Sequence, residues 1–214
     1  MPKGLILSKQ CTNLNKDREK GAKAEIEFCK LLMKKGYDTL RLQYFSKEQA
    51  ASINLNGNKN VLGDIFVISP NHEIFVVEVK EKYPNKFDSY GLEEYRLKHY
   101  IEFQKYLKIP VIYAIKDTKD SNEWYWNCFD NLMVFNPRSF LGDSWVNGSK
   151  QKVKIYYFKK NWFIPMIVDG YINQKWNGFK YPNITEIESI KEFYSNEKFK
   201  KIIDLLNAIS TNSL

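Results

Sequence analysis

The sequence predicts an α/β protein in which helices flank a central mixed sheet. A helical pattern over residues 16–35, two apolar runs joined by a turn over 61–82, and a second helical pattern over 92–108 predict this class. The expected order is helix, strand, strand, strand, helix, strand (αβββαβ). At 214 residues, one domain is expected over 1–214. Its core spans about 16–136, and a C-terminal extension of a β-hairpin and helices spans about 137–214.

The segment Lys16–Lys35 is rich in good helix formers and stops before Gly36, a typical residue just past a helix end. Its expected apolar face consists of Ala22, Ile26, Phe28, Cys29, Leu32 and Met33. Glu25 lies beside that face and is expected to point inward, with Glu27 as its nearest alternative. The next segment, Tyr37–Tyr44, alternates in polarity and predicts a strand.

A hairpin is predicted next. Ile65–Ile68 and Ile74–Val79 are β-branched and aromatic, and Ser69–His72 between them is rich in turn-forming residues. A symmetric register pairs residues whose numbers sum to about 142. Asp64 then lies opposite Glu78, with Cβ atoms about 4.5–5.5 Å apart.

The hairpin brings chemically useful groups together. Because side chains alternate along a strand, Glu78 and Lys80 share a face with Asp64, and the carbonyl of Val79 lies between them. Two close carboxylates repel unless a cation lies between them, and Mg²⁺ prefers such oxygen ligands. We therefore predict a Mg²⁺ site, which Mn²⁺ can also fill, formed by Asp64, Glu78 and the Val79 carbonyl. An ordinary hairpin with solvated charges is the alternative.

Such a site suits phosphodiester hydrolysis. A bound metal ion lowers the pKa of water and stabilises charge on a phosphoryl oxygen. Lys80, beside the metal, would orient or deprotonate the attacking water.

Further elements follow the same patterns. Leu92–Lys108 predicts a helix whose apolar face consists of Tyr95, His99, Phe103, Tyr106 and Leu107, with Gln104 as a structural or surface residue. Val111–Ile115 predicts a buried strand. Short strands are expected at Glu123–Cys128 and Leu132–Phe135, and a polar loop at Asn54–Asn60.

In the C-terminal extension, Val153–Phe158 and Trp162–Val168 predict a hairpin around Lys160 and Asn161. Pro165 restricts its second strand to a sheet edge. Two helices are expected after it, over about 183–206, because capping residues precede an apolar pattern.

The element order and these residues resemble the PD-(D/E)xK nuclease superfamily, which has the restriction-endonuclease-like fold. In that family, two strand carboxylates, a strand lysine and a glutamate of the first helix form the metal site. The matching positions here are Asp64, Glu78, Lys80 and Glu25. Gly21–Glu25 also resembles the opening of archaeal-type Holliday junction resolvases. The likeness covers about Lys16–Lys116, with glycine in place of proline before Asp64.

The resemblance implies a metal-dependent endonuclease that hydrolyses DNA, of a restriction, recombination or phage type. Composition agrees with a nucleic-acid partner, since 33 Lys and Arg against 25 Asp and Glu give a net charge of +8. The segment Ser149–Lys160 carries lysines among aromatic residues, which can follow a phosphate backbone and stack on bases. These lysines are Lys150, Lys152, Lys154, Lys159 and Lys160. Lysines that protect an exposed strand edge are the alternative.

Three widely spaced cysteines indicate free thiols in a reducing cytosol. No apolar run approaches the roughly 20 residues of a membrane span, so a cytoplasmic protein without a membrane partner is expected. A homodimer would suit two cuts in a duplex, and RNA is not excluded as a substrate. Two other function classes stay open: a non-cleaving nucleic-acid-binding protein on a nuclease-like fold, and a basic protein-interaction module.

Overall fold

A computed structural model describes residues 4–42, 52–55, 57–119, 123–146 and 149–175. Side chains are described from residue 19 onward within these ranges, with positions 55, 58, 145 and 146 excepted. The predicted helices at about 183–206 lie outside the described residues. The fold is mixed α/β, with a central mixed sheet and, in the described ranges, three α-helices: α1 (Gly4–Met33), α2 (Glu94–Leu107) and α3 (Phe129–Val134).

The central sheet has six strands in the order β1-β4-β5-β7-β8-β11. Their bounds are β1 (Asp38–Arg41), β4 (Ile65–Ile68), β5 (Ile74–Lys82), β7 (Val111–Asp117), β8 (Trp124–Cys128) and β11 (Ile164–Pro165). Strands β5 and β7 are parallel, and the other neighbours are antiparallel. A parallel pair requires a crossover connection, and this one contains α2.

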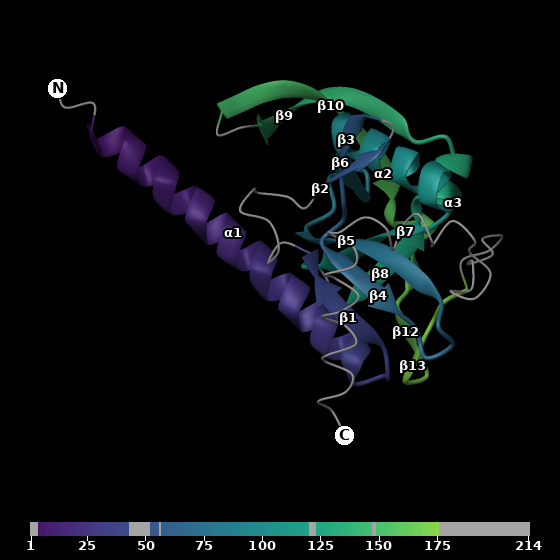
Figure 1. The fold of residues 1–214 in the computed structure, drawn as a ribbon. Helices are drawn as coiled ribbons and strands as arrows, with labels where there is room; N and C mark the ends of the chain where they lie inside the picture. Colours follow the sequence, from purple (N-terminus) through teal and green to yellow (C-terminus); the bar gives the residue numbers. More distant parts are fainter. Residues whose placement is uncertain (1–3, 43–51, 56, 120–122, 147–148, 176–214) are drawn as a thin grey trace.

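Helices cover both faces of this sheet (Figure 1). The buried face of α1 packs against alternate residues of β5, namely Phe75, Val77 and Val79, in one hydrophobic cluster. Ile74 and Val76, on the other face of β5, belong to a second cluster with α2 and α3. The amino-terminal part of α1 projects well beyond the sheet (Figure 1). Strand β5 is therefore buried between two layers, and its two faces meet different helices.

The β4–β5 hairpin has the predicted register. Ile65 pairs with Val77 and Ile68 with Ile74, so the paired numbers sum to 142. The turn closes with a 2.9 Å hydrogen bond from the His72 amide to the Ser69 carbonyl, and His72 has a φ of 64°. The short turn fixes this register, although both strands are buried on both faces.

A second sheet of three strands, in the order β6-β10-β9, packs on the α2 side. Its strands are β6 (Ser89–Glu93), β9 (Arg138–Val146) and β10 (Ser149–Lys159). The predicted hairpin between 153–158 and 162–168 is wrong. Strand β10 pairs with β9 and β6, and after a 3-10 helix at Lys160–Trp162 the chain crosses to the central sheet. Among the described strands, β8 is the one neighbour of β11, so Pro165 lies at an edge of this sheet.

Other segments also differ from expectation. The predicted loop at 54–60 contains a hairpin of β2 (Ser52–Leu55) and β3 (Asn58–Val61). The predicted strand at 132–135 belongs largely to α3. The chain therefore contains β2, β3 and β6 in addition to the elements of the expected order, and a last small hairpin joins β12 (Ile167–Val168) to β13 (Tyr171–Ile172).

The helix faces are rotated from the predicted ones. On α1, Ile26 and Met33 are 37% and 58% exposed. On α2, Tyr95 and Tyr106 are exposed, and the buried residues are Leu97, Tyr100, Phe103 and Gln104. The polar ends of Tyr100 and Gln104 have partners inside the protein, and a pattern based on apolar residues misses such positions.

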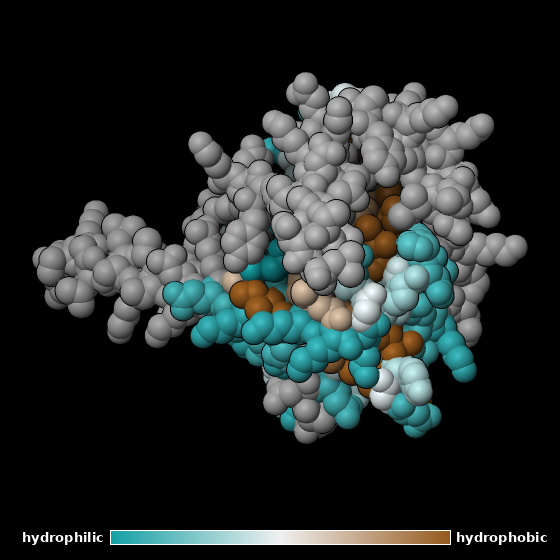
Figure 2. Space-filling view, turned by 60° about the horizontal axis from the view of Figure 1, so that its bottom comes forward, coloured by the Kyte–Doolittle hydropathy of each residue, from teal (hydrophilic) through white to brown (hydrophobic). Residues whose placement is uncertain are grey.

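Described residues on the face in Figure 2 are mostly hydrophilic, and hydrophobic residues appear only in narrow strips between them. Among the described residues, no helix is both long and apolar enough to span a membrane.

Candidate active site

The β4–β5 hairpin brings Asp64, Glu78 and Lys80 together. The paired register ends at Ile65 and Val77, and the Asp64 amide donates a hydrogen bond to the Val77 carbonyl, so Asp64 is not part of the regular ladder opposite Glu78. The Lys80 ammonium nitrogen Nζ lies 2.5 Å from Oε1 of Glu78 and 3.6 Å from Oδ2 of Asp64. Glu78 is fully buried, and Asp64 is 7% exposed. Asp64 is held by the neighbouring strand β5, because its Oδ2 accepts a 2.8 Å hydrogen bond from the Val79 amide.

Three oxygen atoms face one point in this site. Besides the two carboxylate oxygens, the Val79 carbonyl accepts a 3.2 Å hydrogen bond from Nζ of Lys80. Asp64, Glu78 and the Val79 carbonyl are the predicted metal ligands, and all three surround the lysine ammonium. The site is therefore built to hold a positive charge, and in this structure that charge is the ammonium.

Gly63 lets the chain carry Asp64 to this position. A Cβ atom at residue 63 would lie 2.7 Å from Cγ1 of Val76 and 2.8 Å from the Val77 carbonyl oxygen. The Asp64 amide donates a 2.8 Å hydrogen bond to that same Val77 carbonyl. A glycine is therefore required before Asp64, because β5 approaches too closely to leave room for a side chain.

Helix α2 contributes two residues that were not among the predicted site residues. The Tyr100 hydroxyl donates a 2.6 Å hydrogen bond to Oε2 of Glu78. The Arg96 guanidinium donates a 3.1 Å hydrogen bond from Nη1 to Oε1. Arg96 and Tyr100 are four residues apart, the spacing that places both on one helix face. Both oxygens of the buried Glu78 therefore have partners: Oε1 contacts the cations of Lys80 and Arg96, and Oε2 accepts the Tyr100 hydrogen bond.

These partners control the ionisation of Glu78. Burial by itself would raise the pKa of this carboxyl. The charges of Lys80 and Arg96, with the hydrogen bonds from Lys80 and Tyr100, lower the pKa to about 2. Glu78 is therefore a permanent anion in the folded protein.

Asp64 behaves in the opposite way. Burial raises its pKa to about 7, and the nearby Glu78 charge adds to the rise, against the opposing effect of Lys80. For Lys80, burial works to lower the pKa, but the carboxylates of Asp64 and Glu78 raise it overall. Lys80 is thus a charged donor here, which favours orienting water or phosphate over removing a proton.

The predicted helix glutamate Glu25 is buried and pairs with Arg41 of β1. Its Oε2 accepts hydrogen bonds from Nε and Nη2 of Arg41, at 2.9 and 2.6 Å. Glu25 is near enough to act through space, because its charge helps to raise the pKa of Asp64. Its burial raises its own pKa, against the effect of Arg41. The charges of Lys80 and Glu78 also act on the Glu25 carboxyl, the first lowering its pKa and the second raising it.

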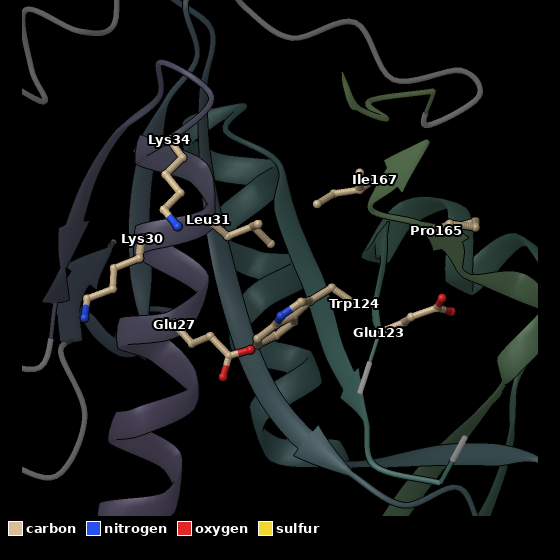
Figure 3. Close-up of a pocket in the computed structure, with 8 residues that line it drawn as sticks. All are labelled: Glu27, Lys30, Leu31, Lys34, Glu123, Trp124, Pro165 and Ile167. Carbon is tan, nitrogen blue, oxygen red and sulfur yellow. The ribbon is translucent and has the colours of Figure 1, made fainter. Parts of the chain in front are cut away.

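The alternative helix glutamate, Glu27, points elsewhere. It forms an ion pair with Lys116 at 2.5 Å. It also lines a pocket of about 660 Å³ between α1 and the β8–β11 edge, shown in Figure 3, and none of the site residues described above lines that pocket. Trp124, Leu31 and Ile167 form the apolar part of the lining.

The predicted nucleic-acid-binding lysines lie on β10 and just after it. Lys150 and Lys152 pair with Asp143 at 3.1 and 2.8 Å, and Lys154 pairs with Glu94 at 2.9 Å. Lys160 pairs with the buried Asp117 at 2.5 Å and has a structural role. The first three keep 45–68% of their side chains exposed, and Lys159 is also exposed.

The donor set fits a hard divalent cation, since it consists of carboxylate and carbonyl oxygens. Among the residues that the structure describes, no three acidic, histidine or cysteine side chains form a metal-binding cluster. The site thus provides two carboxylates and one carbonyl. Such a set leaves other coordination positions for water and phosphate oxygens, an arrangement usual for Mg²⁺.

Comparisons with known proteins give little further identification. No family model matches the sequence, and no curated protein matches it. The chain is similar to a solved structure of Hjc, a Holliday junction resolvase from the archaeal hyperthermophile Archaeoglobus fulgidus. The TM-score is 0.42 at 13% identity, covering 68% of this chain and 91% of that chain. A similarity at this level fixes neither family nor activity, so the function is inferred from the site.

Proposed function

We propose that this protein is a Mg²⁺-dependent endonuclease that hydrolyses DNA phosphodiester bonds. The supporting observation is the convergence of two carboxylates and a backbone carbonyl on one cation position, with a lysine at that position. The net charge of +8 favours a polyanionic substrate. The nuclease domain is proposed to span 1–214, and the exposed lysines of β10 are proposed to contact the DNA backbone away from the site.

Each site residue has a proposed role. Asp64, Glu78 and the Val79 carbonyl would hold the metal ion, which supplies an activated water and stabilises charge on the phosphate. Lys80 would move from the cation position, remain within reach, and orient the attacking water or a phosphate oxygen with its ammonium. Glu25 is proposed to act indirectly, because its negative charge raises the pKa of Asp64.

The test is cleavage of supercoiled, linear and branched DNA in Mg²⁺ or Mn²⁺, with RNA of matched sequence as a further substrate. Asp64→Asn and Lys80→Met are expected to lose at least about 100-fold in rate and to retain DNA binding. Asp38→Asn is a matched control, because Asp38 is exposed on β1. Equal rates in the parent and both site variants would refute the proposed chemistry.

A second candidate is a nucleic-acid-binding protein that does not cleave. The ion pairs of Lys80 favour it, because its ammonium already contacts both carboxylates without a metal ion. DNA binding by the parent, with no cleavage of any substrate in either metal, would select this second function.

A further inference from the structure

The Arg96 guanidinium has a free edge beside the site. Its Nη1 contacts Glu78, and its Nε lies 3.3 Å from the Tyr95 hydroxyl and 3.9 Å from a Glu93 oxygen. Among the described residues, Nη2 has no hydrogen-bond acceptor. The side chain is 31% exposed, whereas that of Glu78 is 1% exposed. Arg96 therefore extends from the buried carboxylate to the surface.

Arg96 shares its Glu78 oxygen with Lys80. The single negative charge of Glu78 is shared by two cations, because both Lys80 and Arg96 contact its Oε1. A metal ion bound at that oxygen would add further positive charge. Lys80 and Arg96 face the carboxylates of Asp64, Glu78 and Glu93, so the group becomes net positive when a divalent ion is added. Arg96 is then the partly exposed cation that an approaching anion would meet.

We infer that Arg96 binds the scissile phosphate through its Nη2 edge, while Nη1 stays on Glu78. A guanidinium is suited to this dual role because its planar donors can bind an anion on one edge and a carboxylate on another. Arg96 thus becomes a substrate-contacting residue supplied by α2, and it ties the phosphate to the carboxylate that would hold the metal. This inference rests on the proposed function.

Two variants separate phosphate binding from support of Glu78. Arg96→Gln removes both the positive charge and the planar set of guanidinium donors. Arg96→Lys keeps a positive charge that can pair with Glu78 but removes the planar fork. Lys98→Gln is the matched control, since Lys98 lies on the same helix with 66% of its side chain exposed. Thermal unfolding of each variant verifies that it is folded.

The first measurement is the salt dependence of DNA binding without divalent metal, which does not require cleavage. Loss of one phosphate contact is expected to reduce the slope of log K against log salt by about 0.9 in Arg96→Gln. An unchanged slope in Arg96→Gln would overturn the inference. Because this measurement needs no catalysis, its outcome is independent of whether the protein is a nuclease.

The second measurement is the rate on DNA with a single phosphorothioate of each configuration at the cleaved bond. In the parent, sulfur at the oxygen that faces Arg96 is expected to slow cleavage. In both Arg96 variants that slowing should disappear, while their rate on normal DNA falls about 100-fold. Two outcomes would overturn the inference: a cleavage rate of Arg96→Lys equal to that of the parent, or the same slowing by sulfur in the parent and both variants. Either would mean that Arg96 only positions Glu78.

Discussion

The Tyr100 hydroxyl donates a 2.6 Å hydrogen bond to Oε2 of Glu78, although the two residues are 22 positions apart in the chain. Both are fully buried. This contact links the second helix to the central strand of the candidate site. It also satisfies a carboxylate oxygen that has no access to water.

Removal of this hydroxyl is expected to destabilise the fold. Tyr100→Phe leaves Oε2 of Glu78 buried without its donor, which should cost about 1.5–3 kcal/mol in the free energy of unfolding. Urea denaturation measures the change. Tyr106→Phe is the control, because Tyr106 is on the same helix and is 48% exposed. Equal unfolding midpoints for the two variants would show that the hydrogen bond adds no stability.

The affinity for metal is expected to depend on pH through Asp64. Its pKa of about 7 is raised by burial and by the Glu78 charge, so the metal-free protein carries a proton there in acidic buffer. A metal ion must displace that proton. Below pH 7 the affinity should therefore fall, by up to about tenfold per pH unit, and above pH 8 it should level off.

Calorimetric titration with Mg²⁺ in buffers of different ionisation enthalpy measures the released proton. Close to one proton should be released at pH 6 and almost none at pH 8. Glu78 does not contribute in this range, because its pKa is about 2. Asp38→Asn should behave as the parent does. Equal proton release at both pH values would place the titrating group elsewhere.

The Lys80 ammonium is expected to compete with the metal ion. Lys80→Met removes the positive charge from the three oxygens and leaves two carboxylates close together, so Mn²⁺ should bind more tightly than in the parent. Cleavage should nevertheless be lost. Titration of Mn²⁺ followed by electron paramagnetic resonance measures the affinity.

Lys20→Met is the control for that experiment. Lys20 lies on α1, its side chain is 57% exposed, and it pairs with Glu81, which is the residue after Lys80 on β5. Its affinity for Mn²⁺ should be unchanged. Weaker binding in Lys80→Met than in Lys20→Met would indicate that the lysine supports the ion instead of competing with it.

Gly63→Ala is expected to be destabilising by about 1–3 kcal/mol, since the new methyl group must push against the Val77 backbone. Gly21→Ala in α1 is the matched control. No heavy atom lies within 4 Å of a Cβ at position 21, so alanine should stabilise the helix by up to about 1 kcal/mol. Thermal unfolding of both variants compares them, and equal stability would contradict the close approach at Gly63.

The hairpin of the site could be predicted from the sequence because its two strands and its turn are neighbours in the chain. Two β-branched and aromatic runs joined by a proline-containing turn predict the register, and the alternation of side chains along a strand predicts that Glu78 and Lys80 share a face. The edge position of Pro165 follows in the same way from its missing amide hydrogen.

Contacts between distant segments could not be predicted in this way. Arg96 looks like an ordinary surface arginine, and its role depends on how α2 lies over β5. The β2–β3 hairpin was missed because its polar residues resemble a loop, although Asn56-Gly57 is a hairpin signal and Gly57 has a φ of 78°. The short apolar run at 132–135 fits either a strand or a helix by periodicity alone.

The burial of Glu78 beneath a partly exposed Lys80 also has a kinetic consequence. An ion arriving from solvent meets the lysine side chain before it meets the carboxylate, and it must shed water to enter. Occupation of the site would then require the side chain to swing out first. At high ion concentration the observed association rate should reach a plateau set by that rotation, instead of rising in proportion to concentration.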